Sequence, residues 1–267
     1  MNKQKIRAAI SYIEEHSFEN IPVAKLAEIT GYNEDYFSEI FRIHTGLSVA
    51  SYIRRYKITL AAFDLLNGLN SGEVAAKYGF ATASGFSKAF RKCYGMSPRE
   101  YKATYDWNPS PTFLSLPDLQ ALCYILLPPN KEFSLNDGGA YWWRKDFNDY
   151  IPEQWEQIKT AGIGDIGGWI HSAEGMKYAF GPIVSDVSVV PEGMEVINIP
   201  AAEYAVFKAP RSVLNSELHR NVVALWVSLY EDWFVNGKIT SDTSRLFFEL
   251  YHDKDTYIYV PISARQI

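Results

Sequence analysis

The alternation of apolar and polar positions follows one pattern twice within the first hundred residues. The first copy, LAEITGYNEDYFSEIFRIHTGLSVASYI, covers residues 26–53, and the second, VAAKYGFATASGFSKAFRKCYGMSPREYK, covers residues 74–102. Each copy predicts a short apolar helix, a tight turn at Gly31 or Gly79, and a second helix. The offset is 48 residues before the turn and 49 after it, so the second copy carries one extra residue just past its glycine.

Two such units predict a tandem helix-turn-helix, in which each second helix fits the major groove of DNA. A repeat near 49 residues is also typical of a helical solenoid, whose units stack into an extended surface. Solenoids need about three or more repeats to bury a core, whereas this pattern stops after two. The tandem helix-turn-helix is therefore the favoured interpretation.

A long helix over residues 49–66 is predicted to join the two units, followed by the C-cap pair Asn67-Gly68. The apolar residues that recur in it at helical spacing are Ile53, Tyr56, Leu60 and Phe63. With the closing signature GFATASGFSKAFRKCYGMSPREYK, residues 1 to about 105 resemble the DNA-binding region of AraC/XylS-type transcriptional activators. The resemblance implies two helix-turn-helix subdomains joined by a long helix, with RNA polymerase as a partner. Because the two units are not identical, we expect an asymmetric double-stranded DNA site across two major-groove segments.

The apolar anchors of the two second helices, which face inward, are Phe37, Ile40, Phe41, Phe86, Ala89 and Phe90. The positions left facing outward are Asp35, Ser38, Glu39, Arg42, Ala83, Ser84, Ser87, Lys88 and Arg91. The resemblance implies base contacts from the first two turns, which makes Glu39 and Lys88 candidate base readers. Arg42 and Arg91 lie further along and are expected to hold phosphates. A carboxylate can accept from cytosine N4, but Asp35 and Glu39 could instead only favour the helix N-terminus.

The net charge of −5 separates into two unlike halves. Residues 1–107 hold 14 Lys/Arg and 11 Asp/Glu, a net of +3, and the remainder has a net of −8. Only the first half suits a polyanion. Because its basic excess is modest, we expect DNA affinity to depend also on helix N-termini and polar contacts.

Cys93 and Cys123 fit neither a disulfide framework nor a zinc site, so both are expected to be buried free thiols in a reducing cytoplasm. The N-terminal MNKQKIRAAI has no apolar core of signal-peptide length, and no run of about eighteen apolar residues occurs. A cytoplasmic chain without membrane contact is expected. The five histidines show no metal-ligand spacing, and neither a metal nor a cofactor is expected.

A short Pro/Ser linker, residues 108–111, precedes a region of different composition that starts at residue 112 and is rich in aromatic and acidic residues. The β-like runs there are 119–127, 203–209, 245–251 and 256–262, with helices predicted over 217–233 and, more weakly, over 152–159. This mixture predicts an α+β fold. The segment SLPDLQALCYI echoes NIPAAEYAVFK at an offset of 83 residues.

Most of residues 112–267 resembles the GyrI-like effector-binding domain, on PEGMEVINIPAAEYAVFKA, the helix bearing Trp226, and FFELY followed by IYVPI. The resemblance implies two β-α-β-β halves related by a pseudo-two-fold axis around a cleft for aromatic, often cationic molecules. The pocket glutamate of that family falls on Glu249. On a strand, Phe247, Glu249 and Tyr251 share one face, and a carboxylate among aromatic rings attracts organic cations.

Further candidates for the walls of this pocket are Tyr178, Trp169, Trp226 and Tyr141. The alternative for each aromatic residue is a place in the core, and for Glu249 a solvated position on an exposed strand. The favoured function is a one-component transcription regulator, which is not an enzyme. Two alternatives stay open: a regulator-fused hydrolase of small electrophiles, with Glu249 as general acid–base, or a second domain that makes only protein–protein contacts.

The segment Gly162–Gly167 spells G-x-G-x-x-G, the dinucleotide-binding fingerprint. That motif functions when it follows a strand and opens a helix. Here it follows the helix-like PEQWEQIK and precedes the strand-like Gly168-Trp169-Ile170, so we expect a helix end and a loop, without a dinucleotide.

Overall fold

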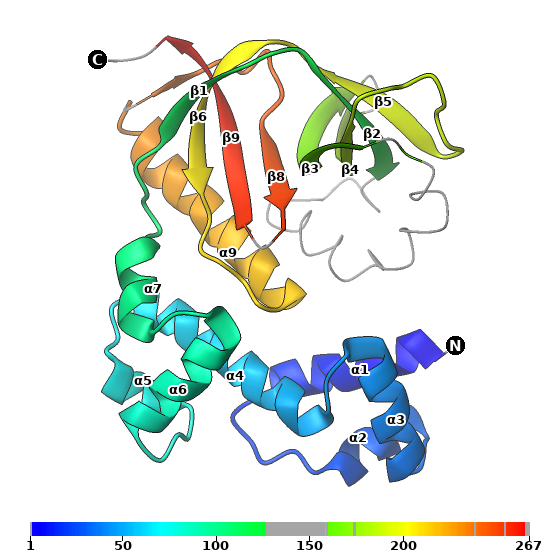
Figure 1. Ribbon diagram of the computed structural model, residues 1–267, viewed down its shortest axis with the longest axis vertical. Helices are drawn as coiled ribbons and strands as arrows, with labels where there is room; N and C mark the ends of the chain where they lie inside the picture. The colour runs from blue at the N-terminus through cyan, green and yellow to red at the C-terminus, as the bar shows by residue number, and fades with distance from the viewer. Residues whose placement is uncertain are drawn as a thin grey trace. The chain divides into compact units, whose positions relative to one another are not determined.

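The computed structural model divides the chain into two compact units, Met1–Thr104 and Tyr105–Ile267 (Figure 1). The residues that the structure describes are 2–126, 158, 160–172, 175–237, 239–253 and 255–264. Tyr105 belongs with the second unit, where its side chain is buried and the Lys208 Nζ lies 5.9 Å from its ring centroid. The expected fold class, a helical tandem helix-turn-helix region followed by an α+β region, is confirmed.

The described part of the first unit is helical. Its helices are α1 (Asn2–Glu15), α2 (Val23–Thr30), α3 (Glu34–Thr45), α4 (Val49–Leu66), α5 (Ser71–Lys77), α6 (Ala83–Tyr94) and α7 (Pro98–Thr104). The pairs α2–α3 and α5–α6 are the two predicted helix-turn-helix units, and α4 joins them (Figure 1).

The turns of the two units form for local reasons. Gly31 and Gly79 have φ values of 68° and 74°, a left-handed conformation that glycine adopts without a steric penalty. The Asn33 side chain then caps α3 by accepting from the Tyr36 N–H at 2.9 Å, and Thr82 caps α6 by accepting from the Gly85 N–H at 3.0 Å. The extra residue of the second copy therefore lies between the glycine and the N-cap, as the sequence indicated.

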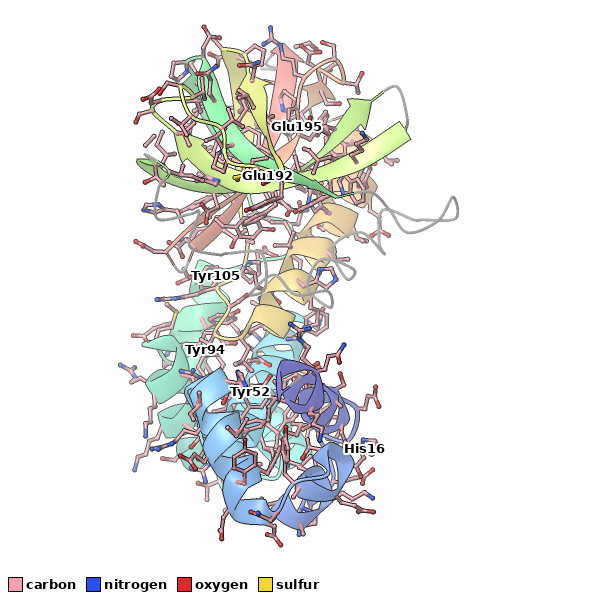
Figure 2. The ribbon with its side chains drawn as sticks, turned by 90° about the vertical axis from the view of Figure 1, so that its right-hand side faces the viewer. His16, Tyr52, Tyr94, Tyr105, Glu192 and Glu195 are labelled. Carbon is pink, nitrogen blue, oxygen red and sulfur yellow. The ribbon has the colours of Figure 1, made fainter. Side chains whose placement is uncertain are left out.

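The core of each unit contains the predicted phenylalanines. Phe37 and Phe41 are fully buried in α3, and so are Phe86 and Phe90 in α6. Each buried ring stabilises the fold by about 1.5–3 kcal/mol relative to exposure. Tyr94, labelled in Figure 2, stacks on Phe90 with ring centroids 4.4 Å apart. The other two anchors, at positions 40 and 89, are only half-buried.

The linker helix α4 has the predicted ends, but its buried face differs from the predicted stripe. Its buried residues are Val49, Tyr52, Ile58, Thr59, Ala61, Ala62 and Leu65. The predicted positions Ile53, Tyr56, Leu60 and Phe63 are half-buried. The reason is that four helices, α3, α5, α6 and α7, pack against α4, so no single stripe faces one core.

The described part of the second unit contains one antiparallel sheet and a helix. Its strands are β1 (Thr112–Leu116), β2 (Leu119–Leu126), β3 (Thr160–Ser172), β4 (Gly175–Val184), β5 (Met194–Ile199), β6 (Ala202–Lys208), β7 (Thr240–Ser241), β8 (Phe248–His252) and β9 (Asp255–Ala264). The sheet order is β1-β6-β9-β8-β3-β4-β2-β5, with β7 beside β9 (Figure 1). Helix α9 (Asn215–Ser228) continues into the π-helix η3 (Leu229–Phe234).

This sheet has the internal two-fold symmetry that the family resemblance implied, and the sequence echo follows it. Exchanging β1, β2, β3 and β4 for β5, β6, β8 and β9 reproduces the same strand order read from the other end. The offset of 83 residues carries the β1–β6 pair Leu116–Ala202 onto the β5–β2 pair Ile199–Leu119. The pseudo-two-fold axis therefore passes between β3 and β8. The weak helix predicted over 152–159 lies outside the described residues, apart from Ile158.

The loop predicted for Gly162–Gly167 is wrong, because these residues lie within β3. Gly162 and Gly164 have positive φ values of 70° and 135°, and the register of β3 against β4 shifts between Thr160 and Asp165. A Cβ at Gly164 would collide with the Tyr251 carbonyl oxygen. Here the glycines accommodate an irregular strand and close backbone approach, and they do not precede a helix.

The helix expected over 217–233 is present as α9 and η3 together. Leu225 and Leu229 pack with Phe207, Ile258 and other apolar residues of β6 and β9. On the opposite face of the sheet, a second cluster gathers Phe248, Leu250 and their neighbours. The odd and even positions of β8 therefore face different layers, as expected for a strand buried on both faces.

Candidate effector-binding site and nucleic-acid interface

The nine predicted DNA-reading residues lie on α3 and α6, on the sides away from the phenylalanine anchors. Seven of them are exposed: Asp35, Glu39, Arg42, Ala83, Ser84, Lys88 and Arg91. Ser38 and Ser87 are half-buried. The first turn of each helix is thus open to a partner, and each of these helices ends in a left-handed glycine, Gly46 or Gly95.

Arg91 lies near the end of α6 and forms an ion pair with Glu100 of α7, with Nη2 and Oε2 3.0 Å apart. Both side chains are well exposed, and exposed pairs are worth at most about 1 kcal/mol. The Ser97 side chain and backbone N–H also bond Glu100, and these bonds hold the pKa of its carboxyl below the ordinary value. The Arg91 guanidinium can therefore exchange this partner for a phosphate at small cost.

Glu249 lies in β8 at the centre of the sheet and is 9% exposed. Three neutral donors surround its carboxylate. The Trp226 Nε1–H of α9 donates to Oε1 at 2.8 Å, and the Tyr178 hydroxyl of β4 donates to Oε2 at 2.8 Å. The Tyr251 hydroxyl also donates to Oε2. Residues from both halves of the domain therefore meet at this one carboxylate.

Gly167 explains why Tyr178 can reach across the sheet. In the register of β3 and β8, Gly167 is paired directly with Glu249. A Cβ at Gly167 would collide with the Tyr178 hydroxyl and would touch the Tyr251 ring. The absence of a side chain at this position makes room for both phenols to lie over β3 and bond Glu249.

Aromatic rings surround the carboxylate on the same face of the sheet. Trp169 meets Tyr178 edge to face with ring centroids 5.2 Å apart, and Phe180 lies 5.9 Å from Tyr251. On the side of α9, Trp226 and Tyr230 have centroids 6.3 Å apart. A negative charge within an aromatic environment favours cations by Coulomb attraction and by cation–π contacts of about 0.5–2 kcal/mol each.

Burial raises the pKa of Glu249 above its ordinary value, and the bonds from Tyr251, Trp226 and Tyr178 oppose that rise. The pKa values of both tyrosines are raised as well, first by burial and then by the charge of Glu249. The phenols therefore keep their protons and act as donors. The site holds one titratable charge that neutral hydrogen bonds stabilise.

The structure brings most of the predicted effector residues together. Tyr178 and Trp226 bond Glu249 directly, and Trp169 packs on Tyr178. Tyr141 lies outside the described residues. Sequence reasoning placed Tyr251 on the face of Glu249 but did not select it as a site residue, and it did not identify Gly167. The strand alternation of FFELY was the available signal for Tyr251.

Both cysteines are free thiols; Cys123 is buried, whereas Cys93 is half-buried, so its expected full burial is wrong. Within the described ranges, histidine, cysteine and carboxylate side chains do not gather in groups that could hold a metal. The helices in those ranges are too short or too polar to cross a membrane.

A tandem helix-turn-helix unit followed by a two-fold sheet domain with a central carboxylate defines a regulator with an effector-binding domain. Family comparisons agree: residues 26–104 match the profile described as "Helix-turn-helix domain", and residues 136–262 match "Integron-associated effector binding protein". The chain belongs to the AraC/XylS-type helix-turn-helix transcriptional regulators, and its second domain matches an effector-binding family.

Two curated relatives match the first unit. The Transposon Tn10 TetD protein of Escherichia coli is 30% identical over 104 residues, which cover 39% of this chain and 75% of TetD. The uncharacterized HTH-type transcriptional regulator YobQ of Bacillus subtilis is 37% identical over 98 residues, 36% of this chain and 41% of YobQ. The chain thus spans less than half of YobQ. Among solved structures, SAV2435 bound to tetraphenylphosphonium covers 58% of this chain and 95% of its own, with a TM-score of 0.46 and 16% identity.

Proposed function

We propose that this chain is a one-component regulator that reads an asymmetric DNA site with residues 1–107 and senses a small aromatic cation with residues 112–267, through the linker 108–111. The observation that carries the sensing proposal is the buried carboxylate of Glu249, which holds three donors from both halves of the domain. The reading proposal is supported by the exposed first turns of α3 and α6 and by the net charge of +3 in that half.

The two recognition helices carry different chemistry, so each is expected to read a different sequence. In α6, Lys88 follows Ser84 by one turn and can donate to guanine in the major groove. In α3, Glu39 follows Asp35 by one turn, and phosphates repel both carboxylates. Glu39 is therefore proposed to accept from a base, while Arg42 and Arg91 hold the backbone.

The hydrogen bonding of Glu249 indicates which cations fit. A carboxylate has about four acceptor positions, and Trp226, Tyr178 and Tyr251 occupy three of them. A ligand rich in N–H donors would have to displace these bonds. A cation without N–H groups, such as a quaternary ammonium compound with aryl substituents, gains the Coulomb attraction and leaves the three bonds in place. We therefore propose a lipophilic, weakly hydrated cation as the effector class.

The hydrolase alternative is less well supported by the same geometry. Activation of water by Glu249 would need a free acceptor position directed at that water, and three are occupied. A tyrosine nucleophile would need a lowered pKa, whereas the pKa values of Tyr178 and Tyr251 are raised. YobQ, which matches the first unit, is named as an HTH-type transcriptional regulator, and this also favours sensing.

The test of reading is selection from random duplex DNA with the full chain. We expect asymmetric sites over about 20 base pairs, because two unlike helices enter successive major grooves. Recovery of only perfect palindromes would contradict tandem reading by one chain. The test of sensing is a titration of the full chain with aryl ammonium cations, followed by tryptophan fluorescence and by DNA affinity. A cation that binds without altering DNA affinity or promoter activity would contradict the regulator assignment.

A further inference from the structure

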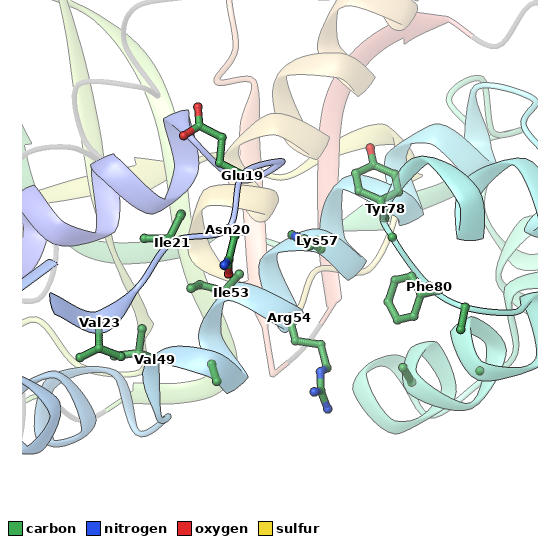
Figure 3. A pocket seen from close by; sticks show the side chains of 15 residues that line it. Glu19, Asn20, Ile21, Val23, Val49, Ile53, Arg54, Lys57, Tyr78 and Phe80 are labelled. Atoms are coloured by element: carbon green, nitrogen blue, oxygen red, sulfur yellow. The ribbon is translucent and has the colours of Figure 1, made fainter. Parts of the chain in front are cut away.

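A cavity of about 560 Å³ lies between the two helix-turn-helix halves of the first unit (Figure 3). One wall is the start of α4, with Val49, Ile53 and Arg54. A second is the α5–α6 turn and the first turns of α6, where Gly79 and Gly85 take part, and a third is the end of the α1–α2 connection with the start of α2, Glu19, Asn20, Ile21 and Val23. Because the residues of this second wall are mostly small, the space between the halves stays open.

Two cations of α4, Arg54 and Lys57, line this cavity. They are three residues apart, so they lie on the same side of the helix. Arg54 is exposed and Lys57 is half-buried. Figure 3 shows Arg54 extending from α4 with its guanidinium at the far end. Glu19 lines the same cavity and is drawn on the side away from that guanidinium.

Neither cation makes an ion pair or a side-chain hydrogen bond with another residue in the described part of the chain. Other cations of this unit do have carboxylate partners. Lys25 pairs with Glu28 at 2.9 Å and Lys77 with Asp64 at 2.7 Å. Two unpaired charges thus remain together in the cavity, within a chain whose overall charge is −5.

The geometry of duplex DNA gives these charges a partner. When two recognition helices enter successive major grooves, about 34 Å apart, the minor groove between them faces the protein. Its two phosphate strands then pass the region between the halves. The cavity lies between the halves and includes Gly85, the neighbour of the predicted base-reading Ser84. We propose that Arg54 and Lys57 contact the phosphates of this intervening segment and fix the distance along the DNA between the major-groove contacts of α3 and α6.

This proposal rests on DNA reading by the tandem unit, and it assigns a role to residues outside the recognition helices. Each phosphate contact contributes about −0.9 to the slope of log K against log salt. Arg54→Gln and Lys57→Gln should each make that slope less steep by about 0.9 and weaken binding about eightfold at 0.1 M salt. The loss should be equal on selected and random duplexes, because phosphates carry no sequence information.

Arg55→Gln is the matched control, since Arg55 is the neighbour of Arg54 on α4 but does not line the cavity. Methylphosphonates in the spacer between the two major-groove contacts remove the phosphate charge, so they should weaken binding by the parent more than binding by Arg54→Gln, which keeps only the Lys57 contact. Arg54→Lys should keep most of the slope. Unchanged slopes in both cavity variants, or an equal loss in Arg55→Gln, would overturn the proposal. If the parent binds no duplex, the proposed function fails and this inference fails with it.

Discussion

Glu249→Gln separates the charge of the candidate effector site from its shape. The amide keeps an oxygen that can accept from Trp226, and the hydroxyls of Tyr178 and Tyr251 can rotate to suit the amide nitrogen. Glu249→Ala would be a poor test, because it leaves three buried donors unpaired at about 1–3 kcal/mol each. A cation about 5 Å from the carboxylate gains about 3 kcal/mol at an effective dielectric constant near 20. Loss of the charge should therefore weaken binding by somewhat more than a hundredfold.

The assay compares a benzyltrimethylammonium cation with its neutral tert-butyl isostere, using tryptophan fluorescence or calorimetry. We expect the cation to lose affinity in Glu249→Gln while the neutral compound is barely affected. Trp226 and Trp169 lie at or near the carboxylate and should report either ligand. Equal binding of the cation by variant and parent would show that Glu249 is an ordinary strand residue and would refute the charged-site argument.

The same substitution should not cost stability. Because the folded-state pKa of Glu249 is raised, the native state binds more protons than the unfolded chain between the ordinary and raised values. The free energy of unfolding therefore decreases as the pH rises through that window, by up to about 1.4 kcal/mol per pKa unit. Glu249→Gln lacks this decrease. Its free energy of unfolding at neutral pH, measured by urea titration, should equal or exceed that of the parent. A clearly lower free energy of unfolding would contradict the raised pKa of Glu249 in the folded state.

Lys88→Ala should weaken specific DNA binding by about 1–3 kcal/mol and relax preference at one base position, and a uniform loss across sequences would instead make Lys88 a phosphate contact. Glu39→Arg should change the preferred base, whereas equal tightening on selected and random DNA would show a purely electrostatic role. Cation affinity should decrease as the pH falls through the raised pKa of Glu249, while the affinity of Glu249→Gln stays flat in the same titration. Asn108 of the linker accepts from the Trp233 indole N–H and donates to Asp232, so Asn108→Ala should leave cation affinity unchanged but reduce the effect of the cation on DNA affinity. An undiminished effect would show that this contact does not couple cation binding to DNA binding.

The first unit could be predicted closely because its determinants are local. Gly31, Gly79 and the caps at Asn33 and Thr82 act within a few residues of the turns that they define. The buried face of α4 could not be predicted, because several helices pack against it at different points along its length. Helical periodicity in the sequence indicates one apolar face, whereas α4 buries residues on more than one face.

In the second unit, prediction from the sequence is limited by contacts between residues that are far apart in the chain. Alternation along β8 placed Glu249 and Tyr251 on one face, but Tyr178 is 71 residues away in sequence and reaches Glu249 only through the register of β3, β4 and β8. Gly167 was assigned to a loop because its segment lies between the helix-like PEQWEQIK and the strand-like Gly168-Trp169-Ile170, yet its missing side chain makes the site possible. Strand β4 contains Gly181 and Pro182, which also conceal it from pattern reasoning.

The helical element that holds the effector carboxylate also holds the linker, and this connects the two proposed activities. Trp226 of α9 donates to Glu249, and Trp233 of the following π-helix donates to Asn108, which itself donates to Asp232. A π-helical turn is rare and often marks functional sites. Trp226 lies on the helix that continues into this segment, so a cation that shifts Trp226 would act on the element to which Asn108 of the linker is bonded. A ligand alters DNA reading only if it favours one conformation over another, and we expect that preference to reach the linker through the bond between Trp233 and Asn108.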